Sequence, residues 1–476
     1  MKTKLLSIGM VLVGGLMAAP IDLGDRRELF VDSHVIAAMN GVSLRLQEPR
    51  REDIAVRFDK PWEGPFSAYA TVLNDNGLFR MYYRGLPTAQ KGRVAVTAYA
   101  ESRDGVNWTK PNLGLFEFQG SRDNNIVLAT EDRFSRNFSP FIDDRPGVPA
   151  DERFKAIAGV EEYGLAGFAS ADGINWRRWG PEEYLFTDGM FDSHNVVFWS
   201  EHEQAYLCYF RTWTGEGFEG WRTISRTTSP DLIEWTDPVR MEFGDTPMEH
   251  LYTNGTQPYF RAPHIYVALA KRFLPERPGV EFELSARLHG NPERGGFASD
   301  AVMLTSRGGS VYDRTFMEGF VRPGPTVRDW AARDNTPALG LVPSLDGRRM
   351  YFYRMSHYGQ PSAHLSRHSL RLDGFVAVHA PYAGGELVTK PLRFSGDELV
   401  LNFASSAAGQ IRVELRDESG RPIPGCSAED CAEIYGDEIE RLVRWNGDPD
   451  LGALAGQVVQ LRFVMADADL FSFRFL

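Results

Sequence analysis

Ser102-Arg103-Asp104-Gly105-Val106-Asn107-Trp108 returns almost unchanged as Ser170-Ala171-Asp172-Gly173-Ile174-Asn175-Trp176. A looser copy is Ser229-Pro230-Asp231-Leu232-Ile233-Glu234-Trp235, and a fourth begins at Ser306-Arg307-Gly308-Gly309. The copies recur about every 60 to 80 residues, a period typical of repeat proteins whose unit is a small sheet. Asp-Gly tolerates the positive φ of a tight turn, and the Ser and Asp side chains can bond the amides of the turn. The pattern therefore predicts a hairpin tip in each repeat.

A second series of segments runs out of phase with these turns, and each member is a short apolar run entered through polar residues. The five runs lie at 67–73, 137–142, 192–199, 254–260 and 333–342. Such runs suit strands that are buried on both faces. Five inner strands, each followed by further strands and a turn, predict five four-stranded sheets. Radial closure of such sheets is a β-propeller.

The sequence changes character after about residue 380. Roughly eight short, alternating strands in the last 95 or so residues predict a β-sandwich, in which the arginines mark one solvated face. We therefore expect an all-β chain: a five-bladed β-propeller over residues 20–380, followed by a small C-terminal β-sandwich over residues 381–476.

The first 19 residues have the parts of a signal peptide, namely Lys2 and Lys4, an apolar stretch at 5–17, and Ala18-Ala19. The stretch is shorter than the roughly 20 residues of a bilayer span, so we expect no span in the mature protein. We expect a secreted or periplasmic bacterial protein. The three cysteines fit such a protein if it does not depend on disulfides. Cys426 and Cys431 could form a local bridge, and Cys208 is expected to be a buried core thiol.

The composition and the missing motifs argue against several classes of function. The 476 residues include 52 Lys and Arg and 64 Asp and Glu, for a net charge of −12. This acidic balance argues against a nucleic-acid partner, because phosphate binding needs a basic face. Motifs for dinucleotides, nucleoside triphosphates, serine hydrolysis and zinc proteolysis are missing from the sequence.

The five inner strands and the Ser-x-Asp-Gly-x-x-Trp turns together resemble the five-bladed propeller glycoside hydrolases, over roughly residues 25 to 380. These include the arabinanase and xylosidase group, the invertase group and the anhydro-galactosidase group. The resemblance implies a funnel on the propeller axis, lined by the first residues of the inner strands, and a carbohydrate substrate. The tail resembles the β-sandwich appended to many secreted polysaccharide degraders.

Two departures prevent a transfer of catalytic residues. The arabinanase group places its general acid as a Glu before an Ala-Pro-His or Gly-Pro-His segment, and here Arg261 stands before Ala262-Pro263-His264. The opening Asn-Asp-Pro-Asn-Gly motif of the invertase group is also missing. A different carboxylate, or a His, must then serve as the acid of a hydrolase.

Glycoside hydrolysis usually needs two carboxyl groups facing each other across the bond. Asp192 opens the third inner strand and is our first candidate for base or nucleophile, with a turn residue as the alternative. His194 falls on the same strand face and could be an acid, a sugar-binding donor or a core histidine. The candidates for the second carboxylate are Glu318 and Asp313, then Glu63 and Asp334.

The candidate substrate-binding residues are arginines, aromatic residues and amides near the starts of the inner strands or in the loop before the fifth. Clustered arginines in an acidic protein favour an anionic sugar, either uronic or sulfated, and tryptophans can stack on sugar rings. These candidates are Arg136, Arg261, Arg322, Arg333, Trp62, Trp330, Asn137 and Asn254.

Two other readings stay open. A polysaccharide lyase would use a His or Tyr base and make His194 and the arginines matter more than paired carboxylates. A non-catalytic glycan-binding propeller would rely on its aromatic residues. No cofactor is expected and no Cys/His set has zinc spacing. A calcium ion on the axis occurs in some of the resembling enzymes, but this sequence does not assign metal ligands.

Overall fold

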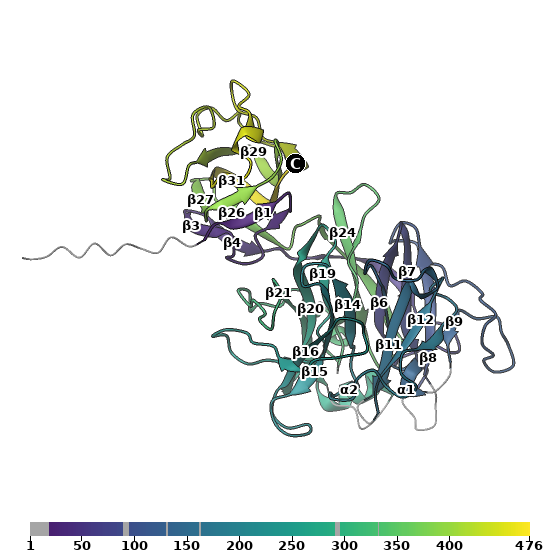
Figure 1. The fold of residues 1–476 in the computed structure, drawn as a ribbon. Helices are drawn as coiled ribbons and strands as arrows, with labels where there is room; N and C mark the ends of the chain where they lie inside the picture. The colour runs from purple at the N-terminus through teal and green to yellow at the C-terminus, as the bar shows by residue number, and fades with distance from the viewer. Residues whose placement is uncertain (1–18, 89–94, 130–131, 161–162, 291–295, 332) are drawn as a thin grey trace, which may run out of the picture. The chain divides into compact units, whose positions relative to one another are not determined.

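The computed structural model describes residues 19–88, 95–129, 132–160, 163–290, 296–331 and 333–476. The chain divides into two compact units (Figure 1). The propeller unit holds the described residues of 29–32 and 44–377, and the second unit combines residues 19–28 with 33–43 and 378–476. The segment expected to be a signal peptide lies, apart from Ala19, outside the described residues.

Five sheets make up the propeller unit, so the predicted five-bladed architecture is confirmed (Figure 1). Blade 1 holds β6 (Ala68–Asp75), β7 (Leu78–Gly85), β8 (Val96–Ser102) and β9 (Ile126–Leu128). Blade 2 holds β10 (Ser139–Ile142), β11 (Phe154–Val160), β12 (Gly164–Ser170) and β13 (Arg177–Trp179). Blade 3 holds β14 (Val196–Ser200), β15 (Ala205–Trp213), β16 (Arg222–Ser229) and β17 (Val239–Arg240).

The last two blades are built from longer and more interrupted strands. In blade 4, β18 (His250–Leu251) and β19 (Thr256–Tyr259) pair with one edge of β20 (Ala262–Pro278), and β21 (Phe297–Ser306) pairs with its other edge. In blade 5, β22 (Thr336–Pro337) and β23 (Val342–Pro343) pair with β24 (Arg349–Ser356), which is followed by β25 (His364–Arg371) and β5 (Arg50–Arg57). The short helices of this unit are α1 (Asp132–Ser135), α2 (Phe282–His289), η1 (Ala150–Glu152) and η2 (Val327–Trp330).

The inner strands lie where the sequence predicts them. They are β6, β10, β14, β19 and β22, and β10 lies beside both β6 and β14. Blade 5 closes against blade 1 through a parallel bridge between Thr71 and Leu339. We call the end of the propeller at which the inner strands begin the entry end. Helices α1 and α2 both lie at this end (Figure 1).

The Asp-Gly turns are confirmed as hairpin tips, and they also join neighbouring blades. The Asp172 carboxylate accepts the N–H groups of Ile174 and Asn175, both at 2.8 Å. Burial acts to raise the pKa of Asp172, but these hydrogen bonds outweigh it and lower the pKa to about 2. The carbonyl of Gly173 accepts the Tyr82 hydroxyl of blade 1 at 2.9 Å. The same contact joins Gly105 to Tyr353 of blade 5, at 2.6 Å.

The second unit is also made of strands, and they are fewer and longer than the sequence suggests. Two long strands, β29 (Leu399–Arg416) and β31 (Gln460–Phe475), pair with each other, and irregular register at Ser405 to Gln410 lets each continue through a bend. The other strands are β1 (Ile21–Gly24), β3 (Ile36–Asn40), β27 (Gly385–Thr389), β28 (Leu392–Phe394) and β30 (Asp437–Leu442), with η3 at Leu451–Leu454.

The N-terminal residues join this second unit, whereas we expected residues 20–380 to be propeller throughout. Strand β3 pairs with β27, and β1 pairs with β28 in parallel. The boundaries between the units along the sequence fall within three further strands, which are β2 (Glu28–Leu29), β4 (Ser43–Leu46) and β26 (Val376–Ala380).

The cysteines are free thiols. Cys208 is buried in the core of blade 3, as predicted, and burial raises the pKa of its thiol. Cys426 and Cys431 are also buried and are not bridged, so the local disulfide considered above is wrong. In the described part of the chain, no helix has both the length and the apolarity needed to cross a membrane.

Candidate functional site at the entry end

Asp192 lies at the entry end, in the polar segment that leads into β14. Its side chain is 36% exposed and forms an ion pair with Arg211 of β15, which is only 3% exposed. The Arg211 guanidinium lies 5.1 Å from the ring centroid of Tyr252, which comes from blade 4. A half-exposed carboxylate fixed by a buried cation can approach a ligand in a defined geometry, as a base or nucleophile must.

Tyr69 brings blade 1 to the same place. Its backbone has φ 49°, an uncommon conformation for an aromatic residue, which is found where the surrounding structure imposes it. The Arg84 guanidinium lies 4.9 Å from the Tyr69 ring centroid and donates to the Tyr358 hydroxyl at 3.2 Å. Burial raises the pKa of Tyr69, the neighbouring Tyr252 adds to this effect, and Arg84 and Arg211 oppose it. Side chains from blades 1, 3, 4 and 5 therefore converge here.

His194 lies where three inner strands meet. Its Nε2 atom is 3.0 Å from the Thr71 hydroxyl and 3.4 Å from the Ser139 hydroxyl, and its ring centroid is 5.8 Å from that of Tyr69. Burial lowers the pKa of His194 to about 4, because a charged imidazole would lose its hydration. At neutral pH His194 is therefore an uncharged hydrogen-bonding group.

A further arginine lies near Tyr252. The Arg222 guanidinium lies 4.2 Å from the ring centroid of Trp213 and 5.6 Å from that of Tyr252. Burial, and then the charges of Arg211 and Arg333, lower the pKa of Arg222. Positive charges that lower the pKa of a neighbouring arginine create a positive potential, which an anionic ligand would relieve. We call this set the Asp192 cluster; its members are Tyr69, Arg84, Asp192, Arg211, Trp213, Arg222, Tyr252 and Arg333.

Arg333 and Asp334 precede β22 of blade 5. Arg333 is exposed and has φ 57°, and its carbonyl accepts the buried Lys271 ammonium group. Asp334 is fully buried, and its Oδ2 atom has no hydrogen-bond partner among the described residues. Burial raises the pKa of Asp334, against the opposing charge of Arg354. Asp334 is thus buried, whereas the Asp192 side chain is partly exposed.

Two predicted residues of blade 1 are buried and have structural partners. Glu63 is 1% exposed, accepts the Tyr83 hydroxyl at 2.6 Å and forms an ion pair with Lys110 at 2.7 Å. Trp62 is buried, and its indole N–H donates to Asn125 at 2.8 Å.

The two predicted asparagines join blades. The side-chain amide of Asn137 donates to the carbonyl of Phe191 at 3.1 Å, and that of Asn254 donates to the carbonyl of His194 at 3.2 Å. Both asparagines are 1% exposed. Their contacts hold the segment that carries Asp192, so they act on the cluster through the backbone.

The remaining predicted residues are dispersed. Glu318 and Arg322 are exposed in the segment that follows β21, and Trp330 is 39% exposed and donates to the carbonyl of Gly324. Arg136 is half-buried beside Asn137 at the entry end. Arg261 lies in the turn after β19, hence at the far end of that strand from Asn254, and pairs with Asp373 at 3.0 Å.

Sequence reasoning did not single out Arg84, Arg211, Arg222 and Tyr252. Arg84 and Arg211 lie within strands rich in apolar residues, which suggest core, and Arg222 starts a mostly polar strand. A usable signal was present, since a long cation inside a buried strand must face a partner or a ligand.

Among the described residues, no group of three or more His, Cys, Asp or Glu side chains is arranged to hold a metal ion.

No family model matches the sequence. A segment of 150 residues is 30% identical to an uncharacterised protein of Mycobacterium tuberculosis; the match covers 31% of this chain and 43% of that protein. The chain thus spans less than half the length of the curated relatives it matches.

Solved structures show a similar course of the chain. An N-acetylgalactosamine deacetylase from F. plautii, in complex with blood group B trisaccharide, is 13% identical, with a TM-score of 0.44 over 71% of this chain and 97% of that one. A β-1,2-mannobiose phosphorylase from Listeria innocua is 12% identical, with a TM-score of 0.45 over 69% and 97%. An α-L-arabinanase from Penicillium chrysogenum, complexed with arabinobiose, is 10% identical, with a TM-score of 0.41 over 68% and 99%.

Proposed function

We propose that this protein is a carbohydrate-active enzyme that hydrolyses glycosidic bonds in a glycan with anionic groups. The observation that carries the proposal is the Asp192 cluster, in which a half-exposed carboxylate stands among aromatic rings and arginines at the entry end. Aromatic rings stack on sugars, and guanidinium groups bind carboxylates and sulfates in a fork geometry.

In this proposal Asp192 is the base or nucleophile, since it is the partly exposed carboxylate of the cluster. Asp334 is the candidate acid, because burial raises its pKa and so favours the protonated form that an acid needs. His194 is neutral at working pH and orients groups near Tyr69 through hydrogen bonds.

The arginines support an anionic substrate. Besides burial, the charges of Arg211 and Arg333 lower the pKa of Arg222, and the guanidinium groups of Arg211 and Arg222 lie near the ring of Tyr252. A uronic or sulfated sugar bound beside that ring would neutralise this positive charge.

A polysaccharide lyase is the second candidate. Such an enzyme can use a tyrosine as its base beside arginines that neutralise the uronate, and Tyr69 lies against Arg84 and near Arg211. Burial raises the pKa of Tyr69, which weakens it as a base at neutral pH and ranks this reading second.

The proposal is tested by product release from neutral, uronic and sulfated glycans, with wild-type protein and Asp192→Asn. New reducing ends that disappear in the variant support hydrolysis at the Asp192 cluster. Products with an unsaturated, ultraviolet-absorbing end mean a lyase. Binding of a glycan without any release means a non-catalytic propeller. We also propose export from the cell, supported by the residue pattern at 1–19.

A further inference from the structure

A hollow of about 520 Å³ lies at the end of the propeller where the inner strands end, opposite the entry end. We call it the exit hollow. Each of the five blades contributes to its wall, through residues that include Asn74, Ile142, Trp199, Gln257 and Leu341. Inner strands surround the axis of a propeller, so a hollow lined from all five blades lies on that axis.

The exit hollow is separate from the Asp192 cluster. Tyr69 of the cluster and Asn74 of the exit hollow lie five residues apart on β6. A strand rises about 3.3 Å per residue, so their Cα atoms are roughly 15 Å apart. One sugar ring does not reach both places, and a ligand in the exit hollow needs its own binding groups.

Buried neighbours hold the wall of the exit hollow in place. The Trp199 ring packs edge-on against that of Tyr206, with centroids 5.0 Å apart and an interplanar angle of 69°. Tyr206 is fully buried and donates to the Asp143 carboxylate at 2.8 Å, and Asp143 pairs with Lys155 at 2.6 Å. These contacts fix the segment that carries Asp144, which is part of the wall. A wall held by a second layer of contacts loses little side-chain entropy when a ligand binds.

Several polar groups on this wall have no partner within the described part of the chain. The indole N–H of half-buried Trp199 and the side-chain amide of half-buried Gln257 make no hydrogen bond to a described residue. The carboxylates of Asp144 and Glu201 form neither a hydrogen bond nor an ion pair with one. Polar groups in such positions take their partners from water or from a ligand.

The lining suits a neutral sugar. Trp199 and Phe260, which is 40% exposed, contribute aromatic rings, and aromatic rings pack on the apolar faces of sugars. Sugar hydroxyls both donate and accept, so they match carboxylates as well as the N–H groups of Trp199 and Gln257. An acidic sugar is disfavoured, because the lining that the structure describes holds two carboxylates and neither Lys nor Arg. An organic cation is disfavoured, because it offers no acceptor to the N–H groups.

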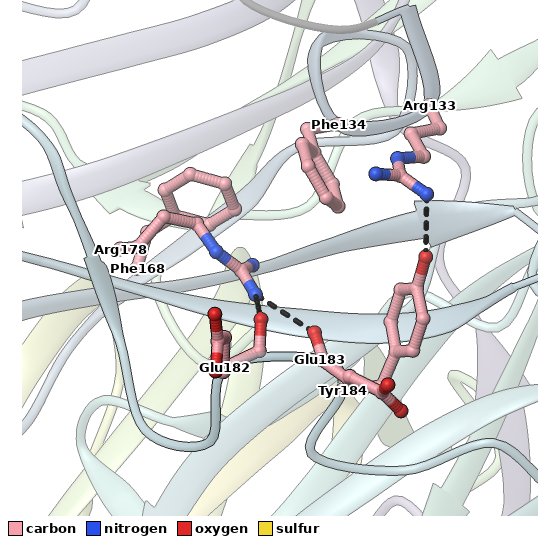
Figure 2. A pocket seen from close by; sticks show the side chains of 7 residues that line it. All are labelled: Arg133, Phe134, Phe168, Arg178, Glu182, Glu183 and Tyr184. Atoms are coloured by element: carbon pink, nitrogen blue, oxygen red, sulfur yellow. Dashed lines mark hydrogen bonds between the residues drawn. The ribbon is translucent and has the colours of Figure 1, made fainter.

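The hollow in blade 2 has a similar volume, about 560 Å³, but a different polar wall (Figure 2). There Arg178 donates to the backbone carbonyls of Glu182 and Glu183 at 3.1 and 2.8 Å, and Arg133 donates to the Tyr184 hydroxyl at 2.7 Å (Figure 2). Those arginines therefore bond to their own wall, whereas the exit hollow leaves N–H groups to a ligand or to solvent.

We propose that the exit hollow binds one or two units of a neutral glycan, at the opposite end of the propeller from the entry end. Trp199 and Phe260 pack on the sugar ring. Asp144 and Glu201 accept from its hydroxyls, and Gln257 donates to them. The site goes beyond the proposed function, because it involves no cleavage and takes a neutral sugar where the entry end takes an anionic one. Such a site attaches the protein to glycan material.

The test measures binding to the full chain by calorimetry, with neutral tetrasaccharides of glucose, xylose, mannose, galactose and arabinose as probes. We expect at least one to bind, with the same affinity at low and high salt, because no ion pair forms. Trp199→Ala should weaken its binding at least tenfold, since it removes a ring contact and a hydrogen bond. Gln257→Ala should weaken it about fivefold.

Two more variants serve as controls. Trp199→Phe keeps a ring against Tyr206 and loses the indole N–H, so it should weaken binding about fivefold and tests the site if Trp199→Ala does not fold. Trp221→Ala is the matched control, because Trp221 is an exposed tryptophan of the hairpin between β15 and β16, at the entry end. It should leave the affinity unchanged. Thermal melting checks that each variant folds.

The outcomes separate this site from the entry end. Binding that is lost in Trp221→Ala or Asp192→Asn and kept in both Trp199 variants would overturn the proposal, since the sugar would then lie at the entry end. Failure of all the tetrasaccharides to bind would overturn it too, as would tighter binding of spermidine than of any sugar. Trp199-dependent binding in a protein that cleaves no glycan would support this site and count against the proposed function.

Discussion

His194 gives the structure a quantitative test. Burial lowers its pKa from 6.5 to about 4, so between these values the unfolded chain binds a proton that the folded chain does not. The folded state therefore loses stability as the pH falls from 6.5 toward 4. From pH 8 to pH 5 the loss from this residue is about 2 kcal/mol, at about 1.4 kcal/mol per pKa unit.

The perturbation is His194→Gln, which keeps an amide near the Thr71 and Ser139 hydroxyls and removes the titrating group. Unfolding free energies from guanidinium chloride titrations at pH 8 and pH 5 should differ by about 2 kcal/mol less in the variant than in wild type. His202→Gln, at an exposed position, is the control. Equal pH dependence in wild type and His194→Gln would refute a buried, neutral His194, and would make an imidazolium acid at this position tenable again.

Three further predictions concern structural residues. Asp172→Ala removes the acceptor for the N–H groups of Ile174 and Asn175, so the free energy of unfolding should fall by about 1 to 2 kcal/mol at pH 7, against no change in exposed Asp188→Ala. Glu63→Gln leaves the Lys110 ammonium without its buried partner and should cost about 2 to 3 kcal/mol in chemical denaturation, while glycan turnover persists; a folded but inactive variant would restore Glu63 as a catalytic candidate. The 3 cysteines should resist Ellman's reagent until the protein unfolds, since all are buried and burial raises the pKa of Cys426 to about 11; rapid labelling of native protein would contradict this burial.

The blade architecture was predictable because its signals are local. An Asp-Gly turn depends only on its own residues, and a few consecutive apolar residues are enough to predict each buried inner strand. Leu232 shows the limit of the pattern, since it occupies the glycine position at φ 71° and is held there by burial in a core. The pairing of β5 with β25 and of β3 with β27 joins segments far apart in the sequence, which no local pattern reveals.

The candidate site was predictable only in part. Asp192 could be chosen because it opens an inner strand, but its partners Arg211 and Tyr252 come from other strands and meet it only in the folded propeller. Arg261 was placed near the entry end because it follows the run at 254–260. The chain reverses directly after Tyr259, so Arg261 lies at the other end of β19.

The central claim is that the Asp192 cluster cleaves an anionic glycan. The most direct test measures reducing ends released from uronic and sulfated glycans by wild type, by Asp192→Asn, and by Glu318→Gln, an exposed carboxylate outside the cluster. The structure predicts release by wild type and Glu318→Gln and at least a hundredfold loss in Asp192→Asn, the size of effect typical of a lost acid–base group. Undiminished release by folded Asp192→Asn would contradict the assignment of the site.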